Sequence, residues 1–266
     1  MVVAFTVFPC PIIAVTSYLC QMVSHAMISG MSDPLCTHQS RRHLLQVGVL
    51  LPFVASLPSC AKEPPLAPEK AFVPDVIPVR NGTAGLVELV RMEPTIRLDL
   101  RYATTNNFTG RVLYKQARAF MIESAAKAVV RAHKALASQG MGLSIFDAYR
   151  PWAVTKQLWD ATEPAKRDYV ANPKRGSRHN RGCAIDLTLC RLADGAQLPM
   201  PSGFDDFSER AHRDYTGGTA EETKNRAILE AIMVVEGFIG MPNEWWHFDY
   251  QDWAQYPVLD IAFEDL

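Results

Sequence analysis

The sequence predicts an α+β protein whose single folded domain has a central antiparallel or mixed sheet flanked by helices. Two observations support this prediction. Short apolar runs typical of buried strands alternate with segments whose apolar side chains recur at helical spacing. These patterns begin near Val79 and fill residues 79–266, which is the length of one ordinary domain of about 100–200 residues.

The first elements of this domain are expected before Gly140. Residues 86–103 contain strand-like pieces that Pro94 interrupts. Residues 117–139 carry apolar side chains at the spacing of a helix, and Gly140 is the expected stop. His133 lies within that helical segment, and we interpret it as a surface or structural histidine.

The second half of the domain continues the same alternation. LSIFDAYRP (143–151) predicts a buried strand that runs into a turn. Pro151 biases Arg150 away from helical geometry, which places Arg150 just past the strand end. The remaining expected elements are a helix over 152–171, a basic loop over 173–182, a strand over 184–189, a helix over 219–238, and final strands at WWHFDY (245–250) and LDIAF (259–263).

Charge and cysteine content limit the classes of function. A net charge of -1 and a pI near 6.7 give no general attraction to nucleic acid or anionic lipid. Cys183 and Cys190 bracket the predicted strand AIDLTL, whose extended length of roughly 23 Å is beyond the reach of a disulfide. Partners must therefore be inferred from a specific site, and we do not expect the domain to depend on disulfide bonds.

The first 60 residues are predicted to be an export signal. SRRHLLQ (40–46) precedes an apolar run that ends in LPSC at Cys60, and this pattern resembles a twin-arginine signal with a lipobox. Pro58 is unusual in such a box. Met31 gives a conventional signal start, and our hypothesis is that residues 1–30 come from an upstream start codon and are not translated.

This signal predicts an exported protein, either periplasmic or anchored to the membrane through a lipidated Cys60 and facing the periplasm. A plain membrane anchor or an internal apolar segment is the alternative, and the protein would be cytoplasmic if the signal is not used. Residues 61–78 are rich in proline and predict a semi-rigid tether to the domain at 79–266.

Polar residues within apolar surroundings point to a site. Asp186 lies inside an apolar strand, where an unpaired carboxylate is disfavoured. With His179 and His247 it would give two imidazoles and one carboxylate, a ligand set found in catalytic zinc sites. A structural salt bridge explains the same residues, and the spacing leaves both open. Cys183 as a ligand or nucleophile is the weaker alternative, because it lacks a partner at metal-ligand spacing.

Glu244 and His247 stand three residues apart in EWWH. Regular strand alternation would put them on opposite faces, so we expect Glu244 at the mouth of the strand. There it would lie close to the metal without binding it, which is the position of a general base acting on water. Trp245 and Trp246 between them either wall the site or pack in the core, and the sequence leaves this open.

Several motifs together resemble one family. SRHNRGCAIDLTL with EWWHFDY is similar to the zinc D-alanyl-D-alanine dipeptidases, the VanX-like branch of the DD-peptidase superfamily. The resemblance covers roughly residues 86–252 and implies the zinc fold of that superfamily. The further matching motifs are NNFTG (106–110), DAYRP (147–151), LPMPSGFDDFSERAH (198–212) and NRAILEAIMVVEGF (225–238).

The resemblance implies a role for each residue of the site. One Zn²⁺ ion per chain would be bound by His179, Asp186 and His247. Glu244 would be the catalytic base and acid, and Arg150 would stabilise the tetrahedral oxyanion.

Residues outside the ligand set are also matched. Asp205 corresponds to the acidic residue that holds the free ammonium of the dipeptide, and Ser177 corresponds to the loop serine near the substrate. Arg178 departs from the family, which often has a second small polar residue there, and this puts the grip on the substrate termini in doubt. His212 matches a histidine of the same stretch, for which we expect a structural role.

The implied function is hydrolysis of D-alanyl-D-alanine, a small D,D-dipeptide, in the turnover of cell-wall peptides. One alternative is a DD- or LD-carboxypeptidase that acts on longer peptidoglycan stem peptides. Asp205 favours the dipeptide, because longer peptides have no ammonium at that position. An alternative of another class is a surface-tethered protein that binds wall peptides without catalysis.

Overall fold

The computed structural model describes residues 75–266 except Ile77. The predicted export signal and residues 61–74 of the predicted tether lie outside the described residues, so their boundaries stay predictions. In the described part of the chain, no helix has the length and the apolar character that crossing a membrane requires.

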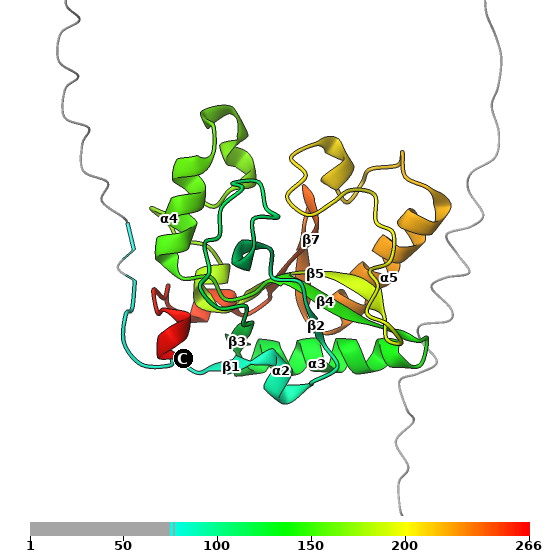
Figure 1. The fold of residues 1–266 in the computed structure, drawn as a ribbon, viewed down its shortest axis with the longest axis horizontal. Helices are drawn as coiled ribbons and strands as arrows, with labels where there is room; N and C mark the ends of the chain where they lie inside the picture. The colour runs from blue at the N-terminus through cyan, green and yellow to red at the C-terminus, as the bar shows by residue number, and fades with distance from the viewer. Residues whose placement is uncertain (1–74, 77) are drawn as a thin grey trace, which may run out of the picture. The chain divides into compact units, whose positions relative to one another are not determined.

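A mixed sheet forms the centre of the described domain and confirms the predicted fold class (Figure 1). Its five strands have the order β2–β4–β5–β7–β6, in which β2 runs parallel to β4 and the other neighbours are antiparallel. A separate antiparallel pair is formed by β1 and β3. The strands are β1 (Leu86–Glu88), β2 (Arg97–Leu98), β3 (Phe120–Ile122), β4 (Met141–Asp147), β5 (Ala184–Arg191), β6 (Phe238–Met241) and β7 (Glu244–Tyr250).

Helices cover the sheet. In Figure 1, α3 lies below the sheet and α4 lies above it. The α-helices are α2 (Leu89–Met92), α3 (Glu123–Ala137), α4 (Trp152–Ala161) and α5 (Ala220–Val235). The 3₁₀ turns are η2 (Arg101–Ala103), η3 (Pro164–Tyr169), η4 (His179–Arg181), η5 (Glu209–Ala211), η6 (Trp253–Gln255) and η7 (Phe263–Asp265).

Local sequence explains where the two longest helices begin and end. The apolar face of α3 includes Val129 and Leu136, both buried in the core, and Gly140 follows with a φ of 69° that suits a glycine after a helix. At the start of α5, the Thr219 side chain accepts a hydrogen bond from the Glu222 backbone. The Glu222 side chain accepts one from the Thr219 backbone in return, forming a capping box.

Four expected elements differ from the structure. The helix expected over 152–171 ends at Ala161, and Pro164, which an α-helix does not tolerate in its interior, begins the 3₁₀ turn η3. The helix expected over 117–139 begins only at Glu123, because Phe120–Ile122 is fully buried and pairs with β1. The helix expected over 219–238 ends at Val235, and Phe238 starts the edge strand β6 after a turn. The strand expected at 259–263 is wrong, since this stretch makes a single bridge, between Leu259 and Val79.

His133 has the structural role that was one of its two expected interpretations. Its ring is buried, and Nδ1 accepts a hydrogen bond from the backbone N–H of Leu143 at 3.1 Å. Its Nε2 lies 2.9 Å from the Thr95 hydroxyl. Burial lowers the pKa of His133, which keeps the ring neutral and able to accept that backbone hydrogen bond.

Candidate active site

Three carboxylate and imidazole side chains form a row across the sheet. Asp147 at the end of β4 is the register partner of Asp186 on β5, and Asp186 is the register partner of His247 on β7. Partners in a row point to the same face of a sheet. The topology therefore brings residues separated by 100 positions of sequence into one site.

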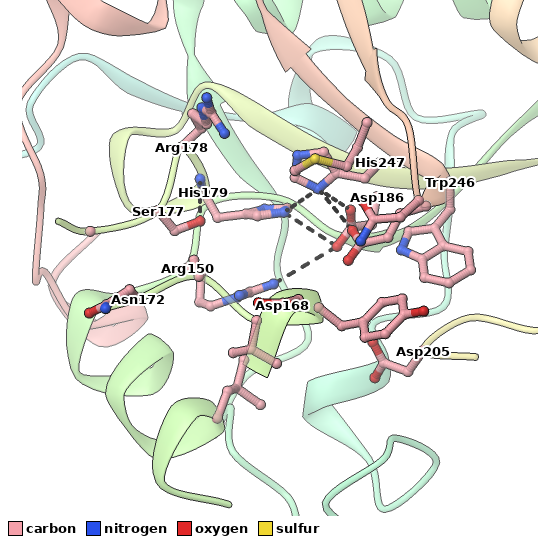
Figure 2. Close-up of a pocket in the computed structure, with 18 of the residues that line it drawn as sticks. Arg150, Asp168, Asn172, Ser177, Arg178, His179, Asp186, Asp205, Trp246 and His247 are labelled. Atoms are coloured by element: carbon pink, nitrogen blue, oxygen red, sulfur yellow. Dashed lines mark hydrogen bonds and ion pairs between the residues drawn. The ribbon is translucent and has the colours of Figure 1, made fainter. Parts of the chain in front are cut away.

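His179 joins this row from the 3₁₀ turn η4 before β5, and the three expected metal ligands converge. One ligand atom from each of His179, Asp186 and His247 lies within 4.8 Å of the others, and all three residues are buried. His179 Nε2 lies 3.2 Å from His247 Nδ1 and 3.4 Å from Asp186 Oδ2. Figure 2 shows these side chains pointing toward one another at the wall of a pocket.

Neighbouring groups fix which ring nitrogen of each histidine faces the cluster. His179 Nδ1 donates to the backbone carbonyl of Ala148 at 2.7 Å, which leaves Nε2 toward the cluster. His247 Nε2 lies 3.0 Å from Asp249 Oδ1, which leaves Nδ1 toward the cluster. Arg178 Nε lies 3.5 Å from the other oxygen of Asp249. Such outer partners are usual for metal-binding histidines.

The electrostatics of the cluster reflect its burial and its charges. Burial works to raise the pKa of Asp186, but the two neighbouring imidazoles lower it well below its ordinary value. Burial works to lower the pKa of His247, but Asp249 and Asp186 outweigh it and raise that pKa to about 10. Two buried carboxylates, Asp186 and Asp249, thus lie beside the imidazoles, and their negative charge favours a cation at this position.

The donor set fits a zinc ion. Two imidazole nitrogens and one carboxylate oxygen at the edge of a cavity match the three protein ligands of open catalytic zinc sites, which leave a fourth position for water or substrate. A purely structural salt bridge accounts less well for two imidazoles that face each other at 3.2 Å.

Glu244 lies beside this cluster because β7 is irregular. Gly240 pairs with Phe248 and Met241 pairs with Glu244, so the residues between Glu244 and Phe248 have no partner on β6. This bulge cancels the regular alternation and puts Glu244 Oε2 3.7 Å from His247 Nδ1. The expected position of Glu244 at the strand mouth is therefore the observed one. Burial raises the pKa of Glu244 to about 7, near the value that suits a general base.

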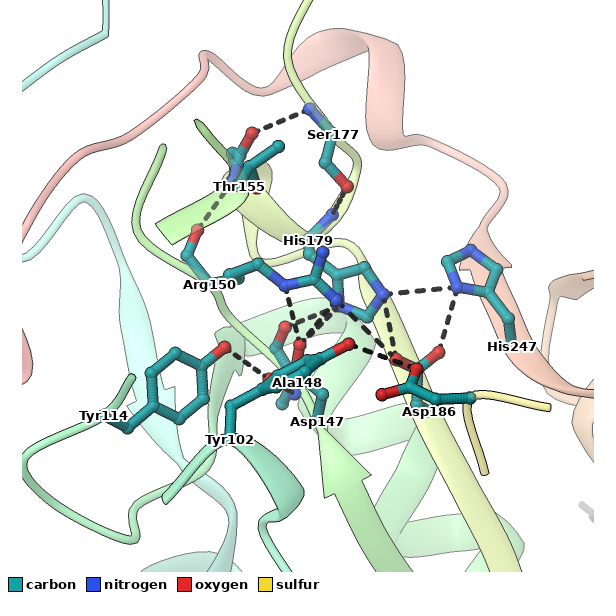
Figure 3. Close-up of polar contacts among 12 residues, drawn as sticks. Tyr102, Tyr114, Asp147, Ala148, Arg150, Thr155, Ser177, His179, Asp186 and His247 are labelled. Atoms are coloured by element: carbon teal, nitrogen blue, oxygen red, sulfur yellow. Dashed lines mark hydrogen bonds and ion pairs between the residues drawn. The ribbon is translucent and has the colours of Figure 1, made fainter. Parts of the chain in front are cut away.

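Arg150 is held by a carboxylate that the sequence analysis did not single out. Asp147 Oδ2 accepts from Arg150 Nε and lies equally close, at 2.8 Å, to the terminal nitrogen of the same guanidinium. Asp147 Oδ1 accepts from the Tyr114 hydroxyl at 2.7 Å and from the Ala148 backbone at 2.9 Å (Figure 3). The guanidinium extends from this anchor to within 3.9 Å of Asp186, next to the metal cluster.

Asp205 lies in the same pocket, whose volume is about 410 Å³. Tyr102 donates to its Oδ1 at 3.2 Å, whereas its buried Oδ2 has no hydrogen-bond partner among the described residues. Its backbone has a φ of 58°, a conformation that non-glycine residues rarely adopt. Burial, followed by the charge of Asp186, raises the pKa of Asp205 to about 8. A buried carboxylate oxygen without a partner, on a residue whose backbone holds an uncommon conformation, is suited to receive a cationic group.

The remaining predicted residues are divided between the pocket and its surroundings. Ser177 lines the pocket, and its Oγ accepts from the His179 backbone at 3.2 Å, which leaves the hydroxyl hydrogen free to donate. Arg178 also lines the pocket and covers the Trp253 ring at 4.6 Å. His212 lies outside the pocket lining, with its Nε2 3.5 Å from the Tyr169 hydroxyl.

The two tryptophans have different places. Trp246 lines the pocket and packs edge-on against Phe204. Trp245 is equally buried, but its indole N–H donates to the Ser202 hydroxyl at 2.9 Å, away from the pocket lining. The question that the sequence left open is thereby answered, since one ring walls the cavity and the other is a packing residue.

Asp147 and Asp249 are the site residues that sequence reasoning missed. Each had a readable signal. Asp147 precedes Arg150 by three residues at a strand end, and Asp249 follows His247 by two, which places both side chains on one strand face.

Comparison with known proteins identifies the family of this chain. The M15 peptidase family model described as D-Ala-D-Ala dipeptidase matches residues 82–264. The D-alanyl-D-alanine dipeptidase of Escherichia coli (strain K12) is 39% identical over 183 residues, which cover 69% of this chain and 93% of that protein. The enzyme of the same name from Enterococcus faecium is 38% identical and covers 59% of this chain and 87% of its own.

A solved structure is also similar. The vancomycin resistance D,D-dipeptidase VanXYg, in complex with a D-Ala-D-Ala phosphinate analogue, has 24% identity, covers 52% of this chain and 53% of its own, and has a TM-score of 0.29. The family match and the relative from Escherichia coli, each covering more than two thirds of this chain, establish that the chain belongs to the D-Ala-D-Ala dipeptidase family of M15 peptidases.

Proposed function

We propose that this protein is a zinc-dependent dipeptidase that hydrolyses D-alanyl-D-alanine. One observation carries the proposal: the buried His179, Asp186 and His247 cluster opens onto a pocket that also contains Glu244. A zinc ion bound there would polarise the scissile carbonyl and lower the pKa of a water molecule to about 7.

The residues around this cluster divide the chemistry between them. Glu244 takes a proton from the attacking water and delivers it to the leaving amine, a role for which its raised pKa is suited. Arg150, fixed by Asp147, directs its guanidinium toward the site and stabilises the negative charge that develops on the carbonyl oxygen.

The charges of the pocket favour a substrate with two free ends. Asp205 offers its unpaired carboxylate oxygen to the ammonium of the dipeptide. Ser177 and Arg178, at the part of the pocket near His179, offer a hydroxyl and a cation to the carboxylate of the dipeptide. A zwitterionic dipeptide complements both charges, whereas a longer stem peptide has no ammonium to place at Asp205. Ser177 keeps the loop serine expected from the family, and Arg178 stands where the family often has a second small polar residue.

Hydrolysis measured on two substrates side by side tests this function. Zinc-loaded protein should cleave D-Ala-D-Ala well and a pentapeptide ending in D-Ala-D-Ala poorly, and a chelator should abolish both activities until zinc is restored. Preference for the pentapeptide would instead identify a carboxypeptidase. Binding of either peptide by calorimetry without any cleavage would identify a non-catalytic wall-peptide binding protein.

We further propose that the protein acts outside the cytoplasm and recycles dipeptide released from the cell wall. The motifs at residues 40–60 support this, since they have the order of a twin-arginine signal and a lipobox. Fractionation of cells that produce the full chain and a Cys60→Ser variant tests the tether. Membrane association of the first and its loss in the second are expected, and equal cytoplasmic recovery of both would contradict export.

A further inference from the structure

The bulge that places Glu244 beside His247 leaves backbone groups of β7 without a strand partner. The paired residues Gly240 and Met241 are neighbours on β6. Their partners on β7, Phe248 and Glu244, are separated by three residues. Within the bulge, the carbonyl of His247 therefore faces no N–H of β6. A buried carbonyl in this situation needs another donor, or the bulge is destabilised.

Arg213 supplies that donor from outside the sheet. Its terminal NH2 donates to the His247 carbonyl at 2.7 Å, and its Nε donates to the Met241 carbonyl at 2.8 Å. One guanidinium thus joins the end of β6 to the far side of the bulge. The backbone N–H of Arg213 also donates to the Pro242 carbonyl, at 2.9 Å, in the turn between the strands.

The Arg213 guanidinium is packed between Phe248 and Gly240. It lies over the Phe248 ring at 4.2 Å from the ring centre, and its side chain is 11% exposed. A Cβ on Gly240 would lie 2.3–2.6 Å from the guanidinium atoms, so any side chain at this position would displace the guanidinium from its observed place. Within the described structure, Arg213 is absent from the residues that line the active-site pocket.

The segment that carries Arg213 is itself anchored by α5. Arg226 donates to the carbonyls of His212 and Tyr215, at 3.1 and 2.9 Å. Arg213 is therefore held from behind while its guanidinium is directed at the bulge.

We infer that Arg213 is a positioning residue, which holds the β6–β7 bulge so that Glu244 stays on the same side of β7 as His247. The inference rests on the proposed function, in which Glu244 is the proton carrier. Arg213 does not touch substrate; it sets the place of a group that does. Loss of its two carbonyl bonds lets the bulge relax toward regular alternation, which moves Glu244 away from the cluster.

Replacement of Arg213 by lysine tests the inference, because lysine keeps the charge but cannot span both carbonyls. In zinc-loaded Arg213→Lys we expect kcat for D-Ala-D-Ala to fall about 10- to 100-fold, since small displacements of a catalytic group are costly. The zinc content should stay at the wild-type level, and KM should change much less than kcat. Methylguanidinium added to an Arg213→Ala variant should restore part of kcat.

Arg226→Lys is the matched control, because Arg226 also donates to two backbone carbonyls, but these belong to His212 and Tyr215 and not to β6 or β7. It should lower the melting temperature with little change in kcat of the folded enzyme. An equal loss of kcat in both variants would mean that Arg213 acts only by anchoring its segment. Unchanged kcat in folded Arg213→Lys would overturn the inference.

Two further measurements keep the inference testable whatever the activity. Gly240→Ala displaces the guanidinium while leaving Arg213 itself in the chain, and we expect the same fall in kcat for this variant. It therefore tests the inference even if the Arg213 variants do not fold. A crystal structure of either variant should show Glu244 withdrawn from its position 3.7 Å from His247, and an unmoved Glu244 would count against Arg213. Wild-type turnover in the same assay tests the proposed function separately, as does its dependence on zinc.

Discussion

Asp186 and His247 are direct register partners on β5 and β7, with Asp186 Oδ1 2.9 Å from His247 Nδ1. The backbone pairing of two central strands thus sets the distance between two of the three proposed zinc ligands. Of the three ligands, only His179 lies outside the strands, in the 3₁₀ turn η4, and its ring is fixed by the Ala148 carbonyl. A site built mainly on strands holds its ligands more rigidly than one built on loops.

Substitutions of Glu244 and of His247 should have different effects: the first should reduce turnover, and the second should remove zinc. Glu244→Gln is expected to keep its zinc and to lose about 10²- to 10⁴-fold in kcat, the usual contribution of a general base. His247→Ala should lose the metal itself, because it removes a ligand atom. Metal analysis of the purified variants beside kcat measures both effects. Near-normal turnover by Glu244→Gln would mean that another group carries the proton.

Asp249 should tune the affinity for zinc without touching the ion. Its carboxylate holds His247 Nε2 at 3.0 Å, and loss of such an outer partner typically weakens metal binding about 10- to 100-fold. Competition with a chromogenic chelator should show this loss in Asp249→Asn. Asp252→Asn, three residues further along the chain, is the control and should bind zinc like the wild type.

Arg150 should matter for the reaction more than for substrate binding. Arg150→Lys cannot give two N–H groups to Asp147 and still extend toward Asp186, so we expect kcat to fall about 10²- to 10³-fold with a smaller change in KM. Arg175→Lys is the control, since Arg175 lines the pocket but forms no ion pair with either aspartate among the described residues. A loss confined to KM would instead assign Arg150 to substrate binding.

Asp205 should make KM for D-Ala-D-Ala depend on pH below about pH 8. Because its pKa is raised to about 8, the carboxyl is mainly protonated at pH 6 and must release that proton when the ammonium binds. KM for D-Ala-D-Ala should therefore fall as the pH rises from 6 toward 8, and should rise again when the substrate amine, with a pKa of about 8, loses its own proton. Asp205→Asn should have a high KM that no longer varies over the acidic range.

The same residue should lower the stability of the protein. A carboxyl group whose pKa is higher in the folded than in the unfolded protein binds more protons when folded, so its contribution to stability falls as the pH rises from about 4 to 8. Asp205→Asn is expected to melt a few degrees above the wild type at pH 8, and less so at pH 5, in metal-free protein. Asp206→Asn serves as the neighbouring control. A variant less stable than the wild type at pH 8 would contradict the raised pKa.

Local sequence patterns were sufficient to predict part of the site. The carboxylate inside the apolar run AIDLTL identified Asp186, and the family motifs identified the fold and the D-Ala-D-Ala dipeptidase family, both confirmed. The sequence indicated that Glu244 and His247 could meet only if the strand departed from regular alternation. The cause of that departure, the pairing of β7 with β6, is visible only in the structure. The roles of these residues and the export signal stay predictions.

Other features depend on contacts between distant residues and could not be predicted locally. β3 and β6 are three and four residues long and adjoin helical segments, so their apolar side chains extended the helical pattern; pairing with β1 and β7 makes them strands. Arg213 binds carbonyls 28 and 34 positions away, and a carbonyl has no signature in the sequence.

The number of residues of β7 that have no partner on β6 also matters for function, because it sets where Glu244 lies relative to His247. A deletion or insertion of one residue between Glu244 and His247 would change this excess of β7 over β6, and with it the side of the strand on which Glu244 lies relative to His247. Transfer of the glutamate and histidine pair to another protein scaffold therefore requires three things together: the three-residue excess, a cation that binds the carbonyls behind it, and a glycine opposite that cation.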